Sequence, residues 1–395
     1  MKAIRFGLCM TILASTIGCQ PYVSDKLSQV SLGSEAAPRA EVMDRNTSSN
    51  DLTSPPSPPA YDALPRSRPK AKGVYVSGWA AGTSKLDKII ELIEQSELNA
   101  LVIDVKNDSG QVTFDSQLPL VKEFGADSEK MIPDIHKLVA DLKKKDIYTI
   151  ARVVVFKDPY AASIKTEWAL HAKDGTIWRN KRGESWIDPY NQQVWKYALD
   201  VAKEAADCGF DEIQFDYVRF PDNSRMIDRE VEYQNPNNWS KTTAIAQFLS
   251  QAKKELNEKG VFVSADVFGL TPSVSDDMGI GQKWSELASE IDVISPMIYP
   301  SHYGSGVFGV EHPDLQPYRI VRQALSDSLD KNDQLLKEGK QPAAVRPWLQ
   351  DFTAAWVKPH QPYGKEEVLS QIQAAKELGI EEYLLWNSSC TYTFR

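Results

Sequence analysis

Two aspartates lie at the ends of two consecutive runs of apolar, aromatic and β-branched residues that predict β-strands. Asp216 belongs to the run 212–217 and Asp266 to the run 261–268. Because side chains alternate between the two faces of a strand, each aspartate falls on the more polar face of its run. Neighbouring strands are about 4.8 Å apart, so the two carboxyl groups would be close enough to change each other's pKa. Such a pair can supply one proton donor and one ionised group.

A pair of this kind matches what hydrolysis of a glycosidic bond requires. One carboxyl group must stay protonated for the leaving oxygen, and the other must be ionised to attack the sugar or to activate water. We therefore predict Asp216 as nucleophile or base and Asp266 as general acid. The alternative is that one or both form structural ion pairs with Arg152, Arg219 or Arg346.

Asp351 is a third and weaker catalytic candidate. It follows the strand-like run 345–350, in which strict alternation would turn its side chain away from the interior. The candidates for substrate binding are polar and aromatic residues at or just after predicted strand ends: Asp104, Arg152, Tyr217, Arg219, Tyr299, His302, Tyr303, Arg346, Trp348, Trp386 and Asn387. Flat rings with polar edges stack on sugar faces, although aromatic residues also form ordinary core. Trp79, Tyr160 and Trp186 share this placement.

Strand-like and helix-like segments alternate along the chain after Gly73. Eight runs predict strands: 73–79, 100–106, 148–156, 212–217, 261–268, 293–299, 345–350 and 383–387. Seven patterns between them predict helices: 85–97, 132–145, 191–208, 243–259, 282–290, 318–337 and 365–378. Strict alternation implies parallel strands joined by right-handed crossovers, and eight such units predict a (β/α)8 barrel of the TIM type.

An open, doubly wound sheet is the alternative fold. It is less favoured because neither GxGxxG nor GxxxxGK[ST] occurs at the expected places, which also argues against a nucleotide as ligand. In a barrel the working residues come from the carboxyl ends of the strands, where the candidates above lie. The long connection 157–190 carries Trp168, Trp178 and Trp186, and we expect it to fold over the barrel mouth.

The first residues have the character of an export signal. Lys2 and Arg5 precede an apolar stretch, 6–17, of the length typical of a signal peptide. The sequence then reaches Gly18-Cys19, which resembles the lipobox of bacterial lipoproteins. We predict a signal peptide over 1–18 and a lipid on Cys19, so the membrane is a partner only through this anchor. The alternatives are cleavage at a nearby position and an uncleaved N-terminal anchor.

A linker and one folded domain are predicted to follow. Residues 20–72 are rich in Ser, Pro, Asp and Asn, so with the lipidated cysteine residues 19–72 form an unstructured tether before the domain 73–395. Gln20 follows the cysteine, and by resemblance to the lipoprotein sorting rule it favours the outer membrane if the source is a diderm bacterium.

Composition excludes several classes of protein. The 395 residues are 42% hydrophobic and 25% charged, which is typical of a folded domain. A formal net charge of −9 argues against a nucleic-acid partner. The cysteines Cys208 and Cys390 do not make a disulfide scaffold, and Cys208 is expected to be a buried thiol. With no Cys/His zinc spacing and no HExxH, we predict neither a metal nor another cofactor.

The chain from Gly73 to about Asn387 resembles the bacterial family labelled putative glycosyl hydrolase domain, a group of (β/α)8 barrels. The resemblance rests on five runs in order: ARVVVFKDP at 151–159, WIDPY at 186–190, GFDEIQFDYVRFP at 209–221, SPMIYPSHY at 295–303 and RPWLQDF at 346–352. It implies a hydrolase of O-glycosyl bonds.

A more distant likeness is to alpha-amylase-type barrels, which carry carboxylates after strands four, five and seven. Asp216, Asp266 and Asp351 fall on these strands, although the acid in those enzymes is Glu.

Three hypotheses about function follow. The leading one is a lipid-anchored glycoside hydrolase acting on a cell-envelope or extracellular polysaccharide or oligosaccharide. The second is a non-catalytic carbohydrate-binding envelope protein on the same barrel, because a fold does not dictate a function. The third is a metal-dependent carbohydrate esterase or deacetylase using Asp104, Asp108 and a histidine.

Overall fold

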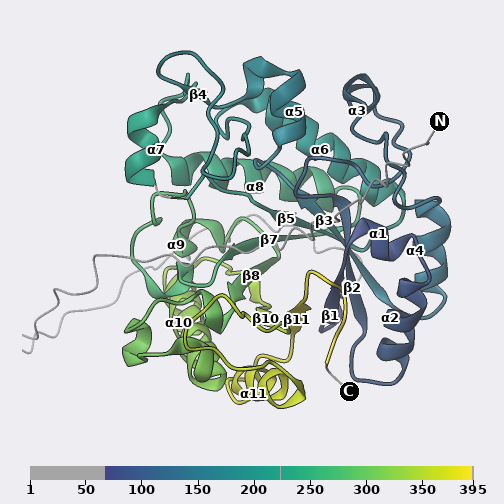
Figure 1. Ribbon diagram of the computed structural model, residues 1–395, viewed down its shortest axis with the longest axis vertical. Coiled ribbons are helices and arrows are strands. Elements are labelled where there is room, and N and C mark those ends of the chain that lie inside the picture. The colour runs from purple at the N-terminus through teal and green to yellow at the C-terminus, as the bar shows by residue number, and fades with distance from the viewer. Residues whose placement is uncertain (1–66, 223, 394–395) are drawn as a thin grey trace, which may run out of the picture.

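Eight parallel strands close into a barrel in the computed structural model, which describes residues 67–222 and 224–393. The order around the barrel is β1, β2, β3, β5, β7, β8, β10, β11, and β11 returns to β1 (Figure 1). Their bounds are β1 (Lys72–Val76), β2 (Ala100–Lys106), β3 (Tyr148–Val154), β5 (Glu212–Asp216), β7 (Phe262–Phe268), β8 (Val293–Ile298), β10 (Trp348–Gln350) and β11 (Tyr383–Trp386). The predicted (β/α)8 barrel is confirmed.

The seventh strand is divided into two pieces. A short strand, β9 (Ala344–Val345), pairs with the start of β8, and β10 then pairs with its end. Arg346-Pro347 lies between the two pieces, and proline cannot donate a backbone hydrogen bond to a ladder. This interruption divides the predicted run 345–350 into β9 and β10.

Helices form the outer ring of the barrel (Figure 1). They are amphipathic, and their apolar residues are buried in the core together with those of the strands. The main ones are α2 (Lys85–Glu94), α4 (Ile135–Lys143), α6 (Gln192–Asp207), α8 (Lys241–Asn257), α9 (Trp284–Leu287), α10 (Pro317–Lys337) and α11 (Lys365–Lys376). Asp134, Asn191 and Ser240 cap α4, α6 and α8, because each side chain accepts from a backbone N–H of the first turn. All seven predicted helices are present, with α9 much shorter than expected.

Shorter elements decorate the loops. They are α1 (Gly78–Ala81), α3 (Pro119–Phe124), α5 (Pro159–Ile164), α7 (Ser224–Glu230), β4 (His171–Ala172), β6 (Val231–Glu232) and the 3-10 turns η1 (Thr166–Trp168), η2 (Thr271–Ser273), η3 (Pro300–His302), η4 (Val307–Gly309) and η5 (Pro313–Leu315). The excursion after β3 and the one after β5 meet where β4 pairs antiparallel with β6. Together they build a wall beside the carboxyl ends of the strands.

Side chains fill the barrel in layers, and the lowest layer is polar. Glu212, at the start of β5, forms a fully buried ion pair with Arg346, and Ser264 also donates to Glu212. Arg346 was predicted to bind substrate, and this prediction is wrong. It lies at the beginning of its strand and therefore belongs to the floor, at the end opposite the mouth. Alternation of side chains along the strand correctly predicts that Arg346 faces the barrel interior. Alternation does not show whether a residue lies near the floor or near the mouth of the barrel.

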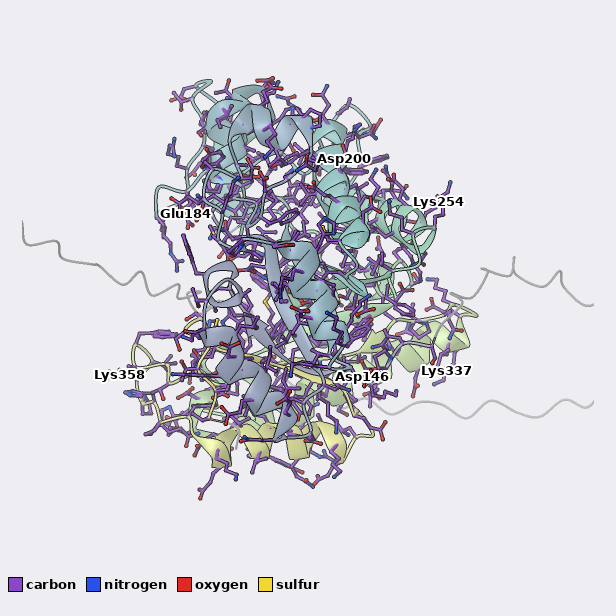
Figure 2. All side chains as sticks on the ribbon, turned by 90° about the vertical axis from the view of Figure 1, so that its right-hand side faces the viewer. Asp146, Glu184, Asp200, Lys254, Lys337 and Lys358 are labelled. Atoms are coloured by element: carbon purple, nitrogen blue, oxygen red, sulfur yellow. The ribbon has the colours of Figure 1, made fainter. Side chains whose placement is uncertain are left out.

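The two ends of the barrel can be told apart in Figure 2. Asp146, which directly precedes β3, lies on the same side as Lys254 and Lys337. Glu184 and Lys358, from loops after the carboxyl ends of strands, lie on the opposite side. The mouth is therefore the face that carries Glu184 and Lys358.

The predicted signal peptide, the lipid on Cys19 and almost all of the tether lie outside the described residues. Within residues 67–222 and 224–393, the model contains no helix with both the length and the apolar character needed to span a bilayer. Cys208 and Cys390 are buried free thiols, as expected for Cys208.

Candidate active site

A hollow opens at the carboxyl ends of the strands, directly above the packed interior. Its floor and walls include Arg152, Asp216, Asp266, Trp348 and Trp386, which come from five different strands or strand ends. We call it the inner hollow. Carboxyl ends of barrel strands are where working residues of this architecture gather.

Asp216 and Asp266 take equivalent positions on adjacent strands. The β5–β7 register pairs Gln214 with Ser264 and Phe215 with Ala265, so the next residues along are the two aspartates. Both side chains are almost fully buried, and both line the inner hollow. The sequence-based prediction that they face one space therefore agrees with their placement.

Asp216 is held by two groups that favour its ionised form. Arg152 donates to Oδ2 from Nε at 3.0 Å and from Nη2 at 2.6 Å. The backbone N–H of Tyr217 donates to Oδ1 at 2.6 Å. This last contact depends on a turn at Tyr217, whose φ of 49° lies in the left-handed region that side chains other than glycine rarely adopt.

Arg152 is shared by three carboxylates. Besides Asp216 it binds Asp104 through Nη1 at 2.7 Å and Asp108 through Nη2 at 3.2 Å. Burial raises the pKa of Asp104 to about 6, and Tyr75 donates its hydroxyl hydrogen to the same carboxyl group. Burial acts to raise the pKa of Asp108, but the charges of Arg152 and Lys157 and the hydrogen bonds to the carboxylate together outweigh it, so the pKa is lowered. Asp216 thus forms the ion pair with Arg152 that was predicted as its alternative role. This ion pair lies in the inner hollow, which is open to solvent.

Asp266 has the opposite environment. Burial raises its pKa well above the usual value, and the negative charge of Asp216 raises it further. Its side chain receives one hydrogen bond, from Trp348 Nε1 to Oδ1 at 2.8 Å, and no cation contacts it within the described residues. The environment of Asp266 therefore favours its protonated form, whereas Asp216 lies in direct contact with the cation Arg152.

Two adjacent carboxyl groups in opposite protonation states can carry out acid catalysis and nucleophilic or base catalysis together. Asp266 lies on the side of the hollow next to Trp348, where it could hold a proton. Asp216 lies on the side next to Arg152, which could balance a negative charge. A positively charged transition state between them would be stabilised by the carboxylate.

A second hollow adjoins the first along the wall built by the excursions after β3 and β5. Trp178, Trp186, Lys181 and Glu184 line it. We call it the outer hollow. The two hollows share Tyr217, Arg219, Phe268, Met297, Tyr299 and His302, so they form one cleft with two lobes. The connection 157–190 contributes to this cleft as predicted, except that Trp168 packs in the core against Phe124 and Tyr197.

Aromatic rings form the rim of the inner hollow. Phe352 and Trp356 are stacked with an interplanar angle of 14°, and Trp356 is 47% exposed. Their neighbour His302 is neutral, because burial lowers its pKa to about 4. Exposed rings at the mouth of a cleft offer the flat apolar faces that sugar rings bind.

Several predicted binding residues do line the cleft. Arg152, Trp348 and Trp386 lie in the inner hollow, Tyr303 in the outer one, and Tyr217, Arg219, Tyr299 and His302 in both. Tyr303 is largely buried, and its hydroxyl group donates to the carbonyl of Gly269.

Other predicted residues lie elsewhere. Asp351 lines neither hollow and accepts hydrogen bonds from the backbone N–H and hydroxyl of Thr393. Asn387 donates to the backbone carbonyl groups of Asp351 and Thr391 and so stabilises the turn after β11. Asp104 reaches the hollow only through Arg152. Trp79 is exposed on α1, and Tyr160 binds the carbonyl of Gly125.

Sequence reasoning missed several residues of the cleft. Asp108 was weighed only as a metal ligand, although it is the third carboxylate on Arg152. Phe352 and Trp356 follow β10 closely, and reading two or three residues further past each strand end would have found them. Phe268 and Met297 also line the cleft and were not among the predicted binding residues.

The third hypothesis needed Asp104, Asp108 and a histidine around a metal. Both aspartates bind Arg152 instead. In the described part of the chain, no three or more His, Cys, Asp or Glu side chains are grouped as a metal site would require.

The comparisons with known proteins agree with this architecture. Residues 73–392 match the protein family described as "Putative glycosyl hydrolase domain". A solved hypothetical protein from Ruminiclostridium thermocellum ATCC 27405 is 36% identical over 52% of this chain and 98% of its own, with a TM-score of 0.45. The glycoside hydrolase domain of PgaB (BpsB) from Bordetella bronchiseptica is 13% identical over 82% of this chain and 95% of its own, with a TM-score of 0.56, and shares the fold. No curated protein matches the sequence.

Proposed function

The chain belongs to the putative glycosyl hydrolase domain family, and from this membership and the geometry of the inner hollow we propose that it is a glycoside hydrolase acting on a polysaccharide. The observation that carries the proposal is the contrast between the two aspartates. Asp266 is buried with no cation in contact among the described residues, and burial raises its pKa, whereas Asp216 is bound by Arg152. Family membership supports the reaction class, and the contrast between the two aspartates supports the roles proposed for them.

In the proposed reaction Asp266 is the general acid. It transfers its proton to the glycosidic oxygen as the bond from that oxygen to the anomeric carbon breaks, and the oxygen keeps the bonding electrons. Asp266 is then a carboxylate next to Asp216, which is unfavourable in a buried site. It can regain a proton from the water that completes hydrolysis, so the pair returns to its first state.

Asp216 is the ionised partner. It stabilises the positive charge that develops at the sugar ring and acts either as nucleophile or as the base that activates water. Its contacts with Arg152 and the backbone N–H of Tyr217 fix the orientation of the carboxylate. Holding such a group in place lowers the entropy cost of reaching the transition state.

The test is hydrolysis by matched variants. We expect the unmodified protein to release reducing ends from at least one glycan in a panel of envelope and plant polysaccharides. Asp266→Asn and Asp216→Asn should each lower kcat by a factor of at least about 100, the size typical of losing an acid–base group. Asp351→Asn, which changes a carboxyl group outside the cleft, should retain most of the activity. Equal activity in all four proteins would contradict the proposal.

The second candidate is a non-catalytic carbohydrate-binding protein. The observation that favours it is that Arg152 and Tyr217 occupy both oxygens of Asp216. Under this reading no glycan of the panel is cleaved, yet one binds with the same affinity to the unmodified protein and to both aspartate variants. The aromatic rim would then supply the affinity.

The cellular location is part of the same proposal. A lipid on Cys19 and the tether 19–72 would hold the barrel at a membrane surface with its mouth free to reach envelope or extracellular glycans. If the source is a diderm bacterium, Gln20 favours the outer membrane.

A further inference from the structure

Arg219 is a buried cation on the wall that the two hollows share. It is only 5% exposed, and it lies three residues after Asp216. Its guanidinium carbon is 4.5 Å from the ring centroid of Phe268 and 5.1 Å from those of Trp186 and Tyr217. These rings hold the guanidinium plane in place by cation–π attraction.

The hydrogen bonds of Arg219 are incomplete. Nη1 donates to the backbone carbonyl of Phe220 at 3.0 Å, and the nearest carboxylate oxygen, on Asp222, is 4.0 Å away. Among the residues that the structure describes, Nε and Nη2 have no acceptor. Neither nitrogen is sealed from solvent, and the Arg219 side chain lines both hollows.

The other two buried arginines of the described barrel differ from Arg219 in this respect. Arg152 binds Asp216, and Arg346 binds Glu212, in each case through a close ion pair. A buried guanidinium without such a partner is costly, because removal of the charge from water is not offset. Arg219 therefore has the environment of a group that is completed by a ligand.

The open donors of Arg219 specify the shape of that ligand. Nε and Nη2 lie along one edge of the guanidinium, and they are the same two donors with which Arg152 binds Asp216. Two parallel N–H groups match the two oxygens of a carboxylate.

The charge around the outer hollow favours an anion. Four of its lining residues are cations, namely Lys157, Lys181, Arg182 and Arg219, whereas only Glu184 and Asp222 are acidic. Lys157 is paired with Glu184 at 3.1 Å. A basic lobe in a chain with a net charge of −9 attracts anions locally while the rest of the surface repels them.

We propose that Arg219 binds a carboxylate carried by the saccharide, so that the polysaccharide is an acidic one. The acidic sugar lies across the wall between the hollows, next to the sugar held by the aspartate pair, and the surrounding rings pack on sugar faces. This inference rests on the proposed function and adds the class of substrate to it.

The experiment measures affinity in native gels that contain a polysaccharide. The probes are polygalacturonate and hyaluronate, each compared with its carboxyl-reduced neutral form, and a glycerol phosphate polymer as a different anion. The unmodified protein should bind at least one carboxylated polymer about tenfold more tightly than its reduced form. Arg219→Gln should lose most of this preference and leave binding of the reduced form unchanged.

Lys254→Gln is the matched control, because it removes one positive charge on α8, on the side of the barrel away from the mouth (Figure 2). It should bind like the unmodified protein. Lys181→Gln changes an exposed residue of the outer hollow and should weaken binding of the carboxylated polymer about twofold to threefold even if Arg219→Gln does not fold.

Three results would overturn the inference. They are equal binding of each carboxylated polymer and its reduced form, an Arg219→Gln variant that behaves like Lys254→Gln, and Arg219-dependent binding of the glycerol phosphate polymer alone. Failure of the proposed function looks different: Arg219-dependent binding of a carboxylated polymer would persist while no glycan is cleaved. Cleavage of a neutral glycan, with no preference for carboxylated polymers in binding, would instead support the proposed function and contradict this inference.

Discussion

At the scale of single residues, the account depends on unequal environments for two identical side chains. Asp216 and Asp266 have the same chemistry, but only Asp216 has a cation within hydrogen-bonding distance. Asp266 has instead a buried position beside a negative charge, and both raise its pKa. The two aspartates are thus suited to different roles, because the environment of Asp266 favours its protonated form and Asp216 lies next to a cation.

A buried carboxyl group with a raised pKa should lower the free energy of unfolding near neutral pH. The variant Asp266→Asn tests this expectation. The pKa of Asp266 is raised on folding, so the folded state binds the proton more tightly than the unfolded state. Its contribution to stability is present below the unfolded-state pKa of about 3.9 and is lost as the pH rises toward the folded-state pKa. We expect Asp266→Asn to raise the free energy of unfolding at pH 7.5 by more than about 1 kcal/mol, with little change at pH 4, since each unit of pKa is worth about 1.4 kcal/mol.

Urea denaturation at the two pH values measures this. The comparison variant is Asp216→Asn, which weakens two charge-assisted hydrogen bonds from Arg152 and should lower stability by about 1–3 kcal/mol. If Asp266→Asn destabilised the protein equally at both pH values, Asp266 would be an ordinary ionised aspartate.

Residue types and alternation predicted much of the site from the sequence. They placed Asp216 and Asp266 on one face of adjacent strands and selected Arg152, Trp348 and Trp386, which the structure brings to the same hollow. Alternation does not give height along a strand, so Arg346 was misplaced. Nor does it reveal which of several carboxylates a single arginine binds, because that depends on side chains from three strands.

At the scale of elements, the register between β5 and β7 places the two aspartates at equivalent backbone positions on adjacent strands. Equivalent positions on adjacent strands are about 4.8 Å apart, which is close to the separation of roughly 5–5.5 Å in retaining glycosidases and below the 6.5–9.5 Å of inverting ones. We therefore expect hydrolysis with retention of the anomeric configuration and Asp216 as nucleophile.

Proton NMR of the first sugar released from a cleaved glycan identifies its anomer before mutarotation. Retention should give the same anomer as the bond that was cut. Release of the opposite anomer would show that Asp216 acts as a base on water, and that the strand register does not set the working separation.

The order of elements could be predicted because apolar runs and helical patterns alternate so regularly. The division of the seventh strand at Arg346-Pro347 has a signal in the sequence, because proline cannot donate to the ladder. The pairing of β4 with β6 could not be predicted, since it depends on contacts between distant loops. These loops carry Trp178, Trp186 and Arg219; the sequence singled out Trp186 and Arg219, but not the contact between the two loops that builds the wall.

At the scale of the whole molecule, the proposal combines a barrel with an anchor. The sequence predicts a lipid on Cys19, followed by a tether and then the folded domain that starts near Gly73. A cysteine that carries two or more acyl chains would hold the barrel in the membrane fraction, because a single acyl chain binds a bilayer only weakly.

Cys19→Ser tests the anchor in the native host. The unmodified protein should be found in the membrane fraction and should incorporate labelled palmitate, whereas the variant should lose the label and its membrane association. Matched replacement of Cys208 by Ser, a buried thiol of the barrel, should leave both properties unchanged. A labelled Cys19→Ser protein would contradict the assignment.

The central claim is that Asp266 keeps its proton at neutral pH because of its burial and because Asp216 is charged. Infrared difference spectra between the unmodified protein and Asp266→Asn, recorded across a pH titration, report the carbonyl stretch of this one carboxylic acid. We predict that the band is present at pH 7 and that Asp216→Asn makes it disappear at a lower pH than in the unmodified protein, because the neighbouring charge is gone. A band that is absent at pH 7, or one that Asp216→Asn leaves unmoved, would contradict the account.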